Sequence, residues 1–335
     1  MINFSAELNS EQLAVVEQGA GPCLVLAGAG SGKTRTITYR VAYLLEQGVK
    51  PEEILLVTFT NKAAAEMKRR VQAITGAAMP LPWSGTFHHI GYRLLKIYAP
   101  LLGYKNNFTV LDSDDSEALI KLCLKDVKPE GTQKKFPSAA VAQAAISFSR
   151  NAERPLAEVL AERFEAASLW TVELERAAEL YKQKKQESGG MDFDDLLTNT
   201  KLLLQNPEVR KKFATQFKYV LVDEYQDTNK IQASICYALS SVHKNILVVG
   251  DDAQSIYSFR AADIEIPRAC VPVIGKFRDE ADILPRAQYP ARQQAIGDII
   301  IDQNRPLANA LHECRIDRID LLLGFGLDFR YLIDM

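Results

Sequence analysis

The sequence has 335 residues, of which 47% are hydrophobic and 24% are charged, and its formal net charge is −2. These values are typical of a soluble globular protein with one large domain or two to three smaller ones. A charge this close to zero gives no general sign of a nucleic-acid-binding protein, so any such function has to rest on local sites.

The composition also favours a reduced, cytoplasmic protein. No apolar run approaches membrane-spanning length, and the first residues, MINFSAELNSEQ, lack a basic end followed by an apolar core. The cysteines are odd in number and widely spread, with neither metal-ligand spacing nor a disulfide framework. They are Cys23, Cys123, Cys236, Cys270 and Cys314.

In the first part of the chain, strand patterns alternate with helix patterns. Strands are predicted at 23–27, 54–59 and 108–112, and helices at 33–46 and 62–74. Asn61 precedes the second helix and is predicted to cap it. Strand–helix alternation of this kind favours an α/β fold in which helices cover a parallel sheet.

A change of pattern then divides the chain. Helical stretches dominate from about 113 to 190, and strand patterns return at 219–224 and 245–251. We therefore expect an α/β domain interrupted by an all-helical insertion. The predicted boundaries are 1–112 plus 190–265 for the α/β domain, 113–189 for the insertion and 266–335 for a tail of different character.

A glycine-rich segment, LAGAGSGKTRT at 26–36, follows a predicted strand and opens a helix. Its glycines let backbone N–H groups turn toward phosphate oxygens, and the helix N-terminus adds positive potential. Lys33 would reach the β- and γ-phosphates, and the Thr34 hydroxyl would bind Mg²⁺. Ala27 stands where the usual pattern has its first glycine. The alternative is a strand-to-helix turn that binds nothing.

Two acids end a later strand. In YVLVDEYQD, Asp223 and Glu224 follow an apolar run. An acid at this place holds Mg²⁺ in nucleotide-hydrolysing enzymes, and a neighbouring glutamate can polarise the attacking water. A strand that ends in Asp-Glu is often merely solvated, but together with the glycine-rich loop it favours nucleoside-triphosphate hydrolysis.

Seven segments in order resemble the motifs of the UvrD/PcrA/Rep-like helicases of superfamily 1, from about Leu8 to Asp263. In that family alanine is usual where Ala27 stands, and LNSEQ resembles its adenine-recognising motif. The segments are LNSEQ (8–12), AGAGSGKT (27–34), LVTFTNKAAAEMKRR (56–70), GTFHHIGYRLL (85–95), MDFDDLL (191–197), VDEYQD (222–227) and VGDDAQSIYSFR (249–260).

The resemblance implies a RecA-like P-loop fold, ATP and Mg²⁺ as cofactors, single-stranded or partly duplex DNA as partner, and 3′-to-5′ movement. The implied catalytic residues are Lys33, Asp223, Glu224 and Gln254, with Thr34 and Asp223 as Mg²⁺ ligands. The implied nucleotide-binding residues are Gln12, Ala27, Gly28, Ala29, Gly30, Ser31, Gly32, Lys33, Thr34 and Arg35. The implied DNA-binding residues are Thr60, Asn61, Phe87, His88, Tyr257, Phe259 and Arg260.

From the residues alone, other interpretations of the DNA-side positions stay open. Tyr257 and Phe259 could be half-buried core aromatics, His88 could belong to a helix start, and the KRR run at 68–70 could be a solvated helix face. In the family the aromatics would stack on bases, which is sequence-tolerant.

The resemblance ends near 264. The family continues with a further motif and a second RecA-like domain, and here only Gln303, Asn304 and Arg305 faintly echo that motif. Since an arginine supplied to the transferred phosphate is worth about 10³–10⁵ in rate in other nucleotide hydrolases, this chain alone is expected to hydrolyse ATP slowly and not to unwind DNA. A frameshifted or truncated gene explains the change, and a natural short protein with its own tail is the alternative.

Three functional hypotheses follow. The first is the ATP-binding half of a DNA helicase, expected to be a monomer that meets repair or replication proteins. The second is a non-catalytic nucleotide- or DNA-binding regulator. The third is an unrelated P-loop enzyme, which failure to bind single-stranded DNA would favour.

Overall fold

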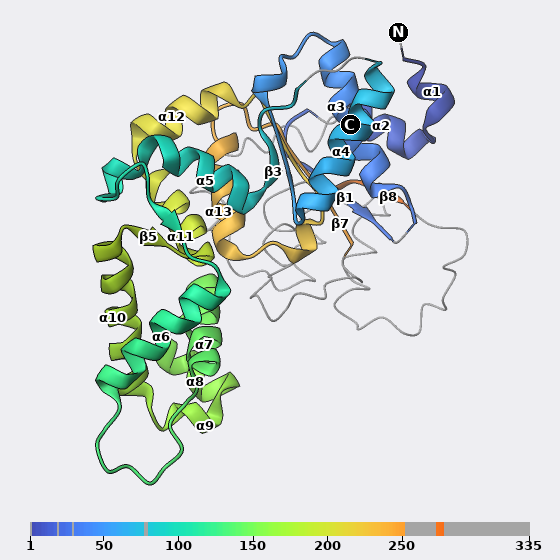
Figure 1. Cartoon of the computed structure of the whole chain (residues 1–335). Coiled ribbons are helices and arrows are strands. Elements are labelled where there is room, and N and C mark those ends of the chain that lie inside the picture. The colour runs from blue at the N-terminus through green and yellow to red at the C-terminus, as the bar shows by residue number, and fades with distance from the viewer. Residues whose placement is uncertain (1, 19, 29, 77–79, 252–272, 278–335) are drawn as a thin grey trace, which may run out of the picture. The chain divides into compact units, whose positions relative to one another are not determined.

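The structure, a computed structural model, describes residues 2–18, 20–28, 30–76, 80–251 and 273–277. Its main feature is a six-stranded sheet in the order β3-β2-β6-β7-β1-β8, and every neighbouring pair is parallel (Figure 1). The strands are β1 (Cys23–Ala27), β2 (Ile54–Thr58), β3 (Ser84–Thr86), β6 (Tyr219–Val222), β7 (Ile246–Gly250) and β8 (Val273–Phe277). The predicted α/β fold with a parallel sheet is confirmed.

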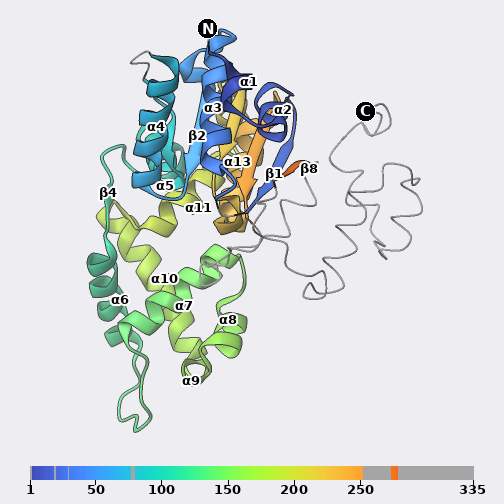
Figure 2. The ribbon, with the colours of Figure 1, turned by 90° about the vertical axis from the view of Figure 1, so that its right-hand side faces the viewer.

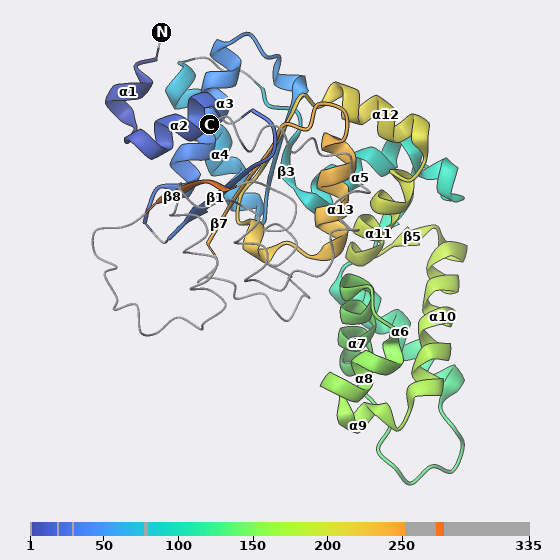
Figure 3. The ribbon, with the colours of Figure 1, turned by 180° about the vertical axis from the view of Figure 1, so that it is seen from behind.

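Helices cover both faces of this sheet, which explains the unbroken apolar runs of its strands. Consecutive strand residues alternate between the two cores: Leu24 belongs to one cluster of buried side chains and Val25 to the other. Figure 2 and Figure 3 show the same layers from two further sides. One face carries α3 (Lys33–Glu46) and α4 (Asn61–Thr75), and the other carries α5 (Phe87–Tyr98), α11 (Phe193–Leu203), α12 (Pro207–Gln216) and α13 (Lys230–Ser240).

The N-terminal helices α1 (Phe4–Glu7) and α2 (Ser10–Gln18) pack on α3 through a small core of their own that includes Phe4 and Tyr39. Three short 3₁₀ helices complete the α/β part. They are η1 (Pro51–Glu53), η2 (Ala99–Leu102) and η3 (Tyr225–Asp227).

Five consecutive helices lie between the strands of a separate two-stranded sheet. The chain leaves through β4 (Thr109–Val110) and returns through β5 (Gly190–Met191), which pair in parallel. The helices bury their own apolar cluster, which includes Trp170 and Tyr181. They are α6 (Ser113–Val127), α7 (Ala139–Ala152), α8 (Leu156–Arg163), α9 (Glu165–Ser168) and α10 (Thr171–Ser188). The domain boundaries given above stay a prediction.

Some predicted elements need correction. The cap of α4 is Thr60, whose hydroxyl accepts the Ala63 N–H at 3.1 Å, while Asn61 is the first helical residue. The strand predicted at 108–112 is only two residues long and pairs with β5, outside the main sheet. Within the stretch that the sequence pattern left without elements, β8 pairs with β1, with a shift of register between Leu24 and Val25.

In the part of the chain that the structure describes, no helix is long and apolar enough to cross a membrane.

Candidate nucleotide site and adjoining cavity

The glycine-rich loop joins β1 to α3 at the carboxyl edge of the parallel sheet, where α/β folds bind their ligands. Gly32 caps α3 with φ 89° and ψ 26°, a left-handed conformation that glycine adopts without strain. The hydroxyl of Ser31 donates to the carbonyl of Gly28 at 2.6 Å, which tightens the turn. The loop therefore has the backbone of a phosphate-binding turn.

Lys33, the first residue of α3, is only 8% exposed. Its Nζ donates to the carbonyls of Ala27 and Gly28 at 3.0 and 3.2 Å, and it lies 3.4 Å from Oδ2 of Asp251, just beyond β7. A buried ammonium group needs such partners because burial without them is costly. The cation is thus held inside the loop, where phosphate oxygens could replace the carbonyls.

Gln12 reaches the same loop from α2. Its Nε2 donates to the carbonyl of Ser31 at 3.0 Å, and its Oε1 accepts from the Asn9 N–H at 3.3 Å. Asn9 in turn accepts from the Gln12 N–H through its own side chain at 2.8 Å. The adenine-recognising prediction for Gln12 is untested, but the residue lies against the phosphate loop.

Arg35 points away from the loop. Its guanidinium pairs with the carboxylate of Glu7 at 2.7 Å, donates to the Glu7 carbonyl, and lies 4.9 Å from the ring centroid of Tyr39. Both members of this ion pair are about half exposed, so a ligand could recruit the guanidinium at little cost.

Asp223 and Glu224 follow β6, which is separated from β1 by β7 alone. Asp223 is 3% exposed. Burial, and then the charge of Glu224, raises the pKa of Asp223 to about 7, while the hydroxyl of Thr34 lies close enough to its carboxyl group to lower this pKa slightly. The sheet thus brings the two predicted Mg²⁺ ligands together.

The donor set fits a magnesium ion. Among the described residues, Oδ1 of Asp223 is a buried oxygen with no hydrogen-bond partner. Mg²⁺ at nucleotide sites is usually bound by one or two protein groups together with substrate phosphates and water. Thr34 and Asp223 would hold it, and it would neutralise charge on the phosphates.

Glu224 lies in the left-handed region, at φ 51° and ψ 44°. This conformation is uncommon for a residue other than glycine and persists where the surroundings enforce it, often at functional sites. Its Oε2 accepts from Nε2 of Gln226 at 2.6 Å. The carboxylate predicted to polarise water is therefore held in one orientation.

A cavity of about 470 Å³ adjoins the carboxyl edge of the sheet. Of the predicted DNA-binding residues, Phe87 and His88 line it, whereas Thr60 and Asn61 do not. Phe87 is 6% exposed and part of the core, and the His88 ring meets Phe193 edge-on at 5.7 Å. Gln254, Tyr257, Phe259 and Arg260, and also Ala29, lie outside the described residues.

Two aromatic residues that line the cavity were not predicted individually from the sequence. Phe59 and Phe193 both line it, and Phe193 is 47% exposed, which is unusual for a large apolar side chain. Both belong to segments singled out in the sequence, LVTFTNKAAAEMKRR and MDFDDLL. An aromatic next to polar helix-start residues was the signal available.

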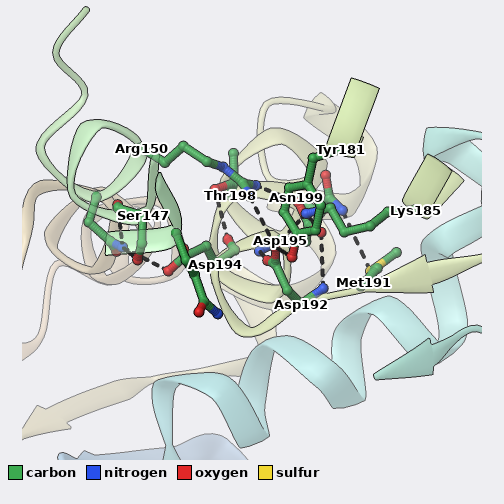
Figure 4. A network of polar contacts seen from close by, with 12 residues as sticks. Ser147, Arg150, Tyr181, Lys185, Met191, Asp192, Asp194, Asp195, Thr198 and Asn199 are labelled. Atoms are coloured by element: carbon green, nitrogen blue, oxygen red, sulfur yellow. Dashed lines mark hydrogen bonds and ion pairs between the residues drawn. The ribbon is translucent and has the colours of Figure 1, made fainter. Parts of the chain in front are cut away.

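Charged side chains form a network at the start of α11 (Figure 4), and its members Arg150, Asp192 and Asp194 line the cavity. Lys185 of α10 is 1% exposed and contacts both Asp192 and Asp195 at the start of α11. Arg150 of α7 pairs with the same two carboxylates. Ion pairs thereby connect helices α7 and α10 of the inserted segment to the segment that follows β5.

A phosphate-type loop after β1, a buried aspartate after β6 and a fully parallel sheet define a P-loop nucleoside-triphosphate-binding fold. Within that class, the chain belongs to the UvrD/REP helicase N-terminal domain family, which matches residues 8–269.

Individual relatives agree with this assignment. Over 261 residues the chain is 41% identical to the ATP-dependent DNA helicase PcrA of Staphylococcus aureus (strain Mu50) and 40% identical to that of Staphylococcus epidermidis (strain RP62A). Each match covers 77% of this chain and 35% of the relative. The chain thus spans about a third of the length of the curated relatives it matches.

Proposed function

We propose that this chain supplies the ATP-binding site and part of the single-stranded-DNA surface of a 3′-to-5′ ATP-dependent DNA helicase or translocase. The observation that carries the proposal is the meeting of Thr34 with Asp223 beside the buried Lys33. Two segments about 190 positions apart in the chain converge there, as Mg²⁺-dependent phosphoryl chemistry requires.

Each residue then has a role. Lys33 neutralises the β- and γ-phosphates after exchanging its loop carbonyls for phosphate oxygens, and the backbone N–H groups around Gly32 bind the same phosphates. Gln12 binds the base edge. Glu224 takes a proton from the attacking water, and its fixed orientation aligns that water. Thr34 and Asp223 would hold Mg²⁺, which would offset the charge that develops on the phosphates.

The cavity supports the DNA half of the proposal. Its aromatic lining, with Phe59 and Phe193 beside His88, suits unstacked bases of a single strand or of a partial duplex. Asp192 and Asp194 also line it, and the guanidinium of Arg150 in the lining is already paired with Asp192, so we expect bases rather than phosphates to enter the cavity. Tyr257, Phe259 and Arg260 complete the proposed DNA path, and Gln254 senses the γ-phosphate.

We expect the 335-residue polypeptide to turn over ATP slowly, since Arg35, which adjoins the phosphate loop, pairs with Glu7 and does not act as an arginine supplied to the transferred phosphate. Such an arginine is worth about 10³–10⁵ in rate in other nucleotide hydrolases. We expect the polypeptide to bind and hydrolyse ATP as a monomer, without any repair or replication protein.

Fluorescent ATP-analogue binding and single-turnover hydrolysis of radiolabelled ATP by excess protein test the proposal. Lys33→Met should weaken binding of Mg·ATP at least ~10-fold. Glu224→Gln should keep binding and lower the hydrolysis rate constant by about 10²–10⁴-fold. Lys121→Met, on the exposed side of α6, is the control.

Two results would contradict the proposal. Equal affinity of the unaltered chain and of Lys33→Met for the ATP analogue would refute the assignment of the nucleotide site. Normal binding of the ATP analogue with no effect of Glu224→Gln on hydrolysis would favour the alternative, a regulator that binds nucleotide or DNA without catalysis.

For the DNA half, Phe193→Ala should weaken the binding of single-stranded DNA by about 1–3 kcal/mol.

A further inference from the structure

The side chain of Gln226, in η3, bridges two segments of the nucleotide site. Its Nε2 donates to Oε2 of Glu224 at 2.6 Å, and its Oε1 accepts the backbone N–H of Asp251 at 3.0 Å. Gln226 is 3% exposed, and none of the predicted roles involves it. One carboxamide thus joins the proposed catalytic carboxylate to the residue that directly follows β7.

The backbone at the end of β7 is shaped around this carboxamide. A Cβ atom on Gly250 would lie 2.9 Å from Oε1 of Gln226 and 3.3 Å from its backbone N. Contacts under 3.0 Å are essentially never found for real Cβ atoms, so any other residue here would displace Gln226 or the strand. Gly250 is therefore needed for close approach, while its φ is unremarkable.

Only a carboxamide performs both halves of the bridge without adding charge. Glutamine donates through its nitrogen and accepts through its oxygen, whereas an ionised glutamate accepts only and would place a second negative charge against Glu224. Methionine has the same length and makes neither bond. Glutamate therefore removes only the bond to Glu224, and methionine removes both bonds.

The bridge extends to the phosphate loop. Asp251 contacts Lys33 through its carboxylate and Gln226 through its N–H, so its position depends on both. A displacement of Asp251 is transmitted to the carboxylate of Glu224 through Gln226. Asp251 also directly precedes the segment that carries Gln254.

We propose that Gln226 is a positioning residue for ATP hydrolysis, which ties the carboxylate of Glu224 to the end of β7. This inference rests on the proposed ATPase function. Gln226 acts through Glu224: it donates a hydrogen bond to the carboxylate of this residue, whose backbone lies in the left-handed region. Movement at the end of β7 thus changes the hydrolysis rate while nucleotide binding stays the same.

Three variants of the full chain test this. Gln226→Met removes both hydrogen bonds, and Gln226→Glu keeps only the one that Asp251 donates. Gly250→Ala keeps Gln226 itself and pushes its carboxamide out of place. Each should lower the single-turnover hydrolysis rate constant by about 10- to 100-fold, because a misplaced catalytic group loses that much. The affinity for the ATP analogue should stay within about twofold of the unaltered chain, since Lys33 and the loop are unchanged.

A second measurement reads the bridge without catalysis. Hydrogen exchange of the Asp251 amide, followed in a peptide that covers 246–251, should accelerate in Gln226→Met and much less in Gln226→Glu. Gln183→Glu is the matched control, because Gln183 also donates to a glutamate, Glu187 at 2.9 Å, on the exposed side of α10. Its hydrolysis and exchange should equal those of the unaltered chain.

The outcomes are distinct. Hydrolysis at the normal rate by Gln226→Met, or unchanged exchange at Asp251, overturns the inference while the ATPase proposal stands. Loss of ATP affinity in parallel with rate in all three variants also overturns it and leaves Gln226 with a purely structural role. If the unaltered chain neither binds nor hydrolyses ATP, the proposed function fails and the inference fails with it. Should Gln226→Glu not fold, the other two variants decide.

Discussion

Asn229, the N-cap of α13, donates from Nδ2 to Oδ1 of Asn151 in α7 at 2.8 Å. Asn151 donates in turn to Oδ1 of Asp194 at 2.7 Å and to the Ser147 carbonyl at 2.9 Å. One asparagine of the inserted helices therefore contacts both the segment after Glu224 and the start of α11. Asn229, Asn151 and Asp194 all line the cavity, so the hydrogen bonds between them stabilise its shape.

Asn151→Ala should lower the free energy of unfolding by about 1–3 kcal/mol, because Nδ2 of Asn229 and Oδ1 of Asp194 each lose a partly buried hydrogen bond. Urea unfolding measures the change. Asn107→Ala, in an exposed turn, should stay within about 0.5 kcal/mol. An unchanged urea midpoint for Asn151→Ala would show that water replaces the bridge.

The lysine pair in α10 offers a sharper stability contrast. Lys185 is buried between Asp192 and Asp195, whereas its neighbour Lys184 pairs with Asp126 at the surface at 3.3 Å. Lys185→Met should cost about 3–5 kcal/mol, since two buried carboxylates then share Arg150 alone as their cation. Lys184→Met should cost less than about 1 kcal/mol. Comparable losses in thermal unfolding would contradict this assignment.

Asp192 makes the fold sensitive to acid. Burial alone would raise its pKa, but Arg150 and then Lys185 outweigh burial and lower the pKa to about 2. A carboxyl whose pKa is lower in the folded state stabilises the protein above its unfolded pKa of about 4 and loses that contribution as the pH falls to 2. The expected loss is about 2 kcal/mol.

Asp192→Asn tests the acid effect, because asparagine still caps α11 but does not ionise. The difference in urea stability between the unaltered chain and this variant should shrink between pH 4 and pH 2. Asp194 changes stability in the opposite direction, since burial and the charge of Asp192 raise its pKa. A difference that stays constant with pH would refute the assignment to Asp192.

The glycines of the phosphate loop should differ in tolerance. Gly32→Ala forces a left-handed conformation on alanine, and its Cβ would lie 2.7 Å from Nε2 of Gln12. We expect a loss of about 1–2 kcal/mol in nucleotide-free thermal unfolding. Gly28→Ala, where a Cβ meets nothing within 4 Å, should unfold like the unaltered chain. Equal behaviour of the two variants would argue against the observed turn.

Much of the α/β part was predictable because its signals are local. The apolar run at 23–27 and the helix at 33–46 agree with β1 and α3, and their order along the chain indicated a parallel sheet. Thr34 and Asp223 were predicted as Mg²⁺ ligands from their motifs, and the structure places them near one another because the carboxyl ends of parallel strands share one edge of the sheet.

Contacts between distant side chains could not be predicted in this way. Nothing local distinguishes Gln226 from a solvated turn residue, since its bridge to Asp251 depends on how η3 packs against β7. Lys185 looks like one more charged residue in YKQKKQE, yet it is buried, because α10 turns that side toward α11. Arg35 pairs with Glu7 because α1 folds back on α3, an approach that no sequence period records.

The position of β1 within the sheet has a consequence for synthesis on the ribosome. β1 pairs with β7, and Gly21, just before it, donates to the side chain of Asn245, 224 positions later. Synthesis proceeds at about 5–20 residues per second, so roughly 10 to 50 seconds pass between the synthesis of β1 and that of its partner β7. During this interval an apolar strand edge is open to wrong pairing, so newly made chains of this protein should depend on chaperones until residue 250 has emerged.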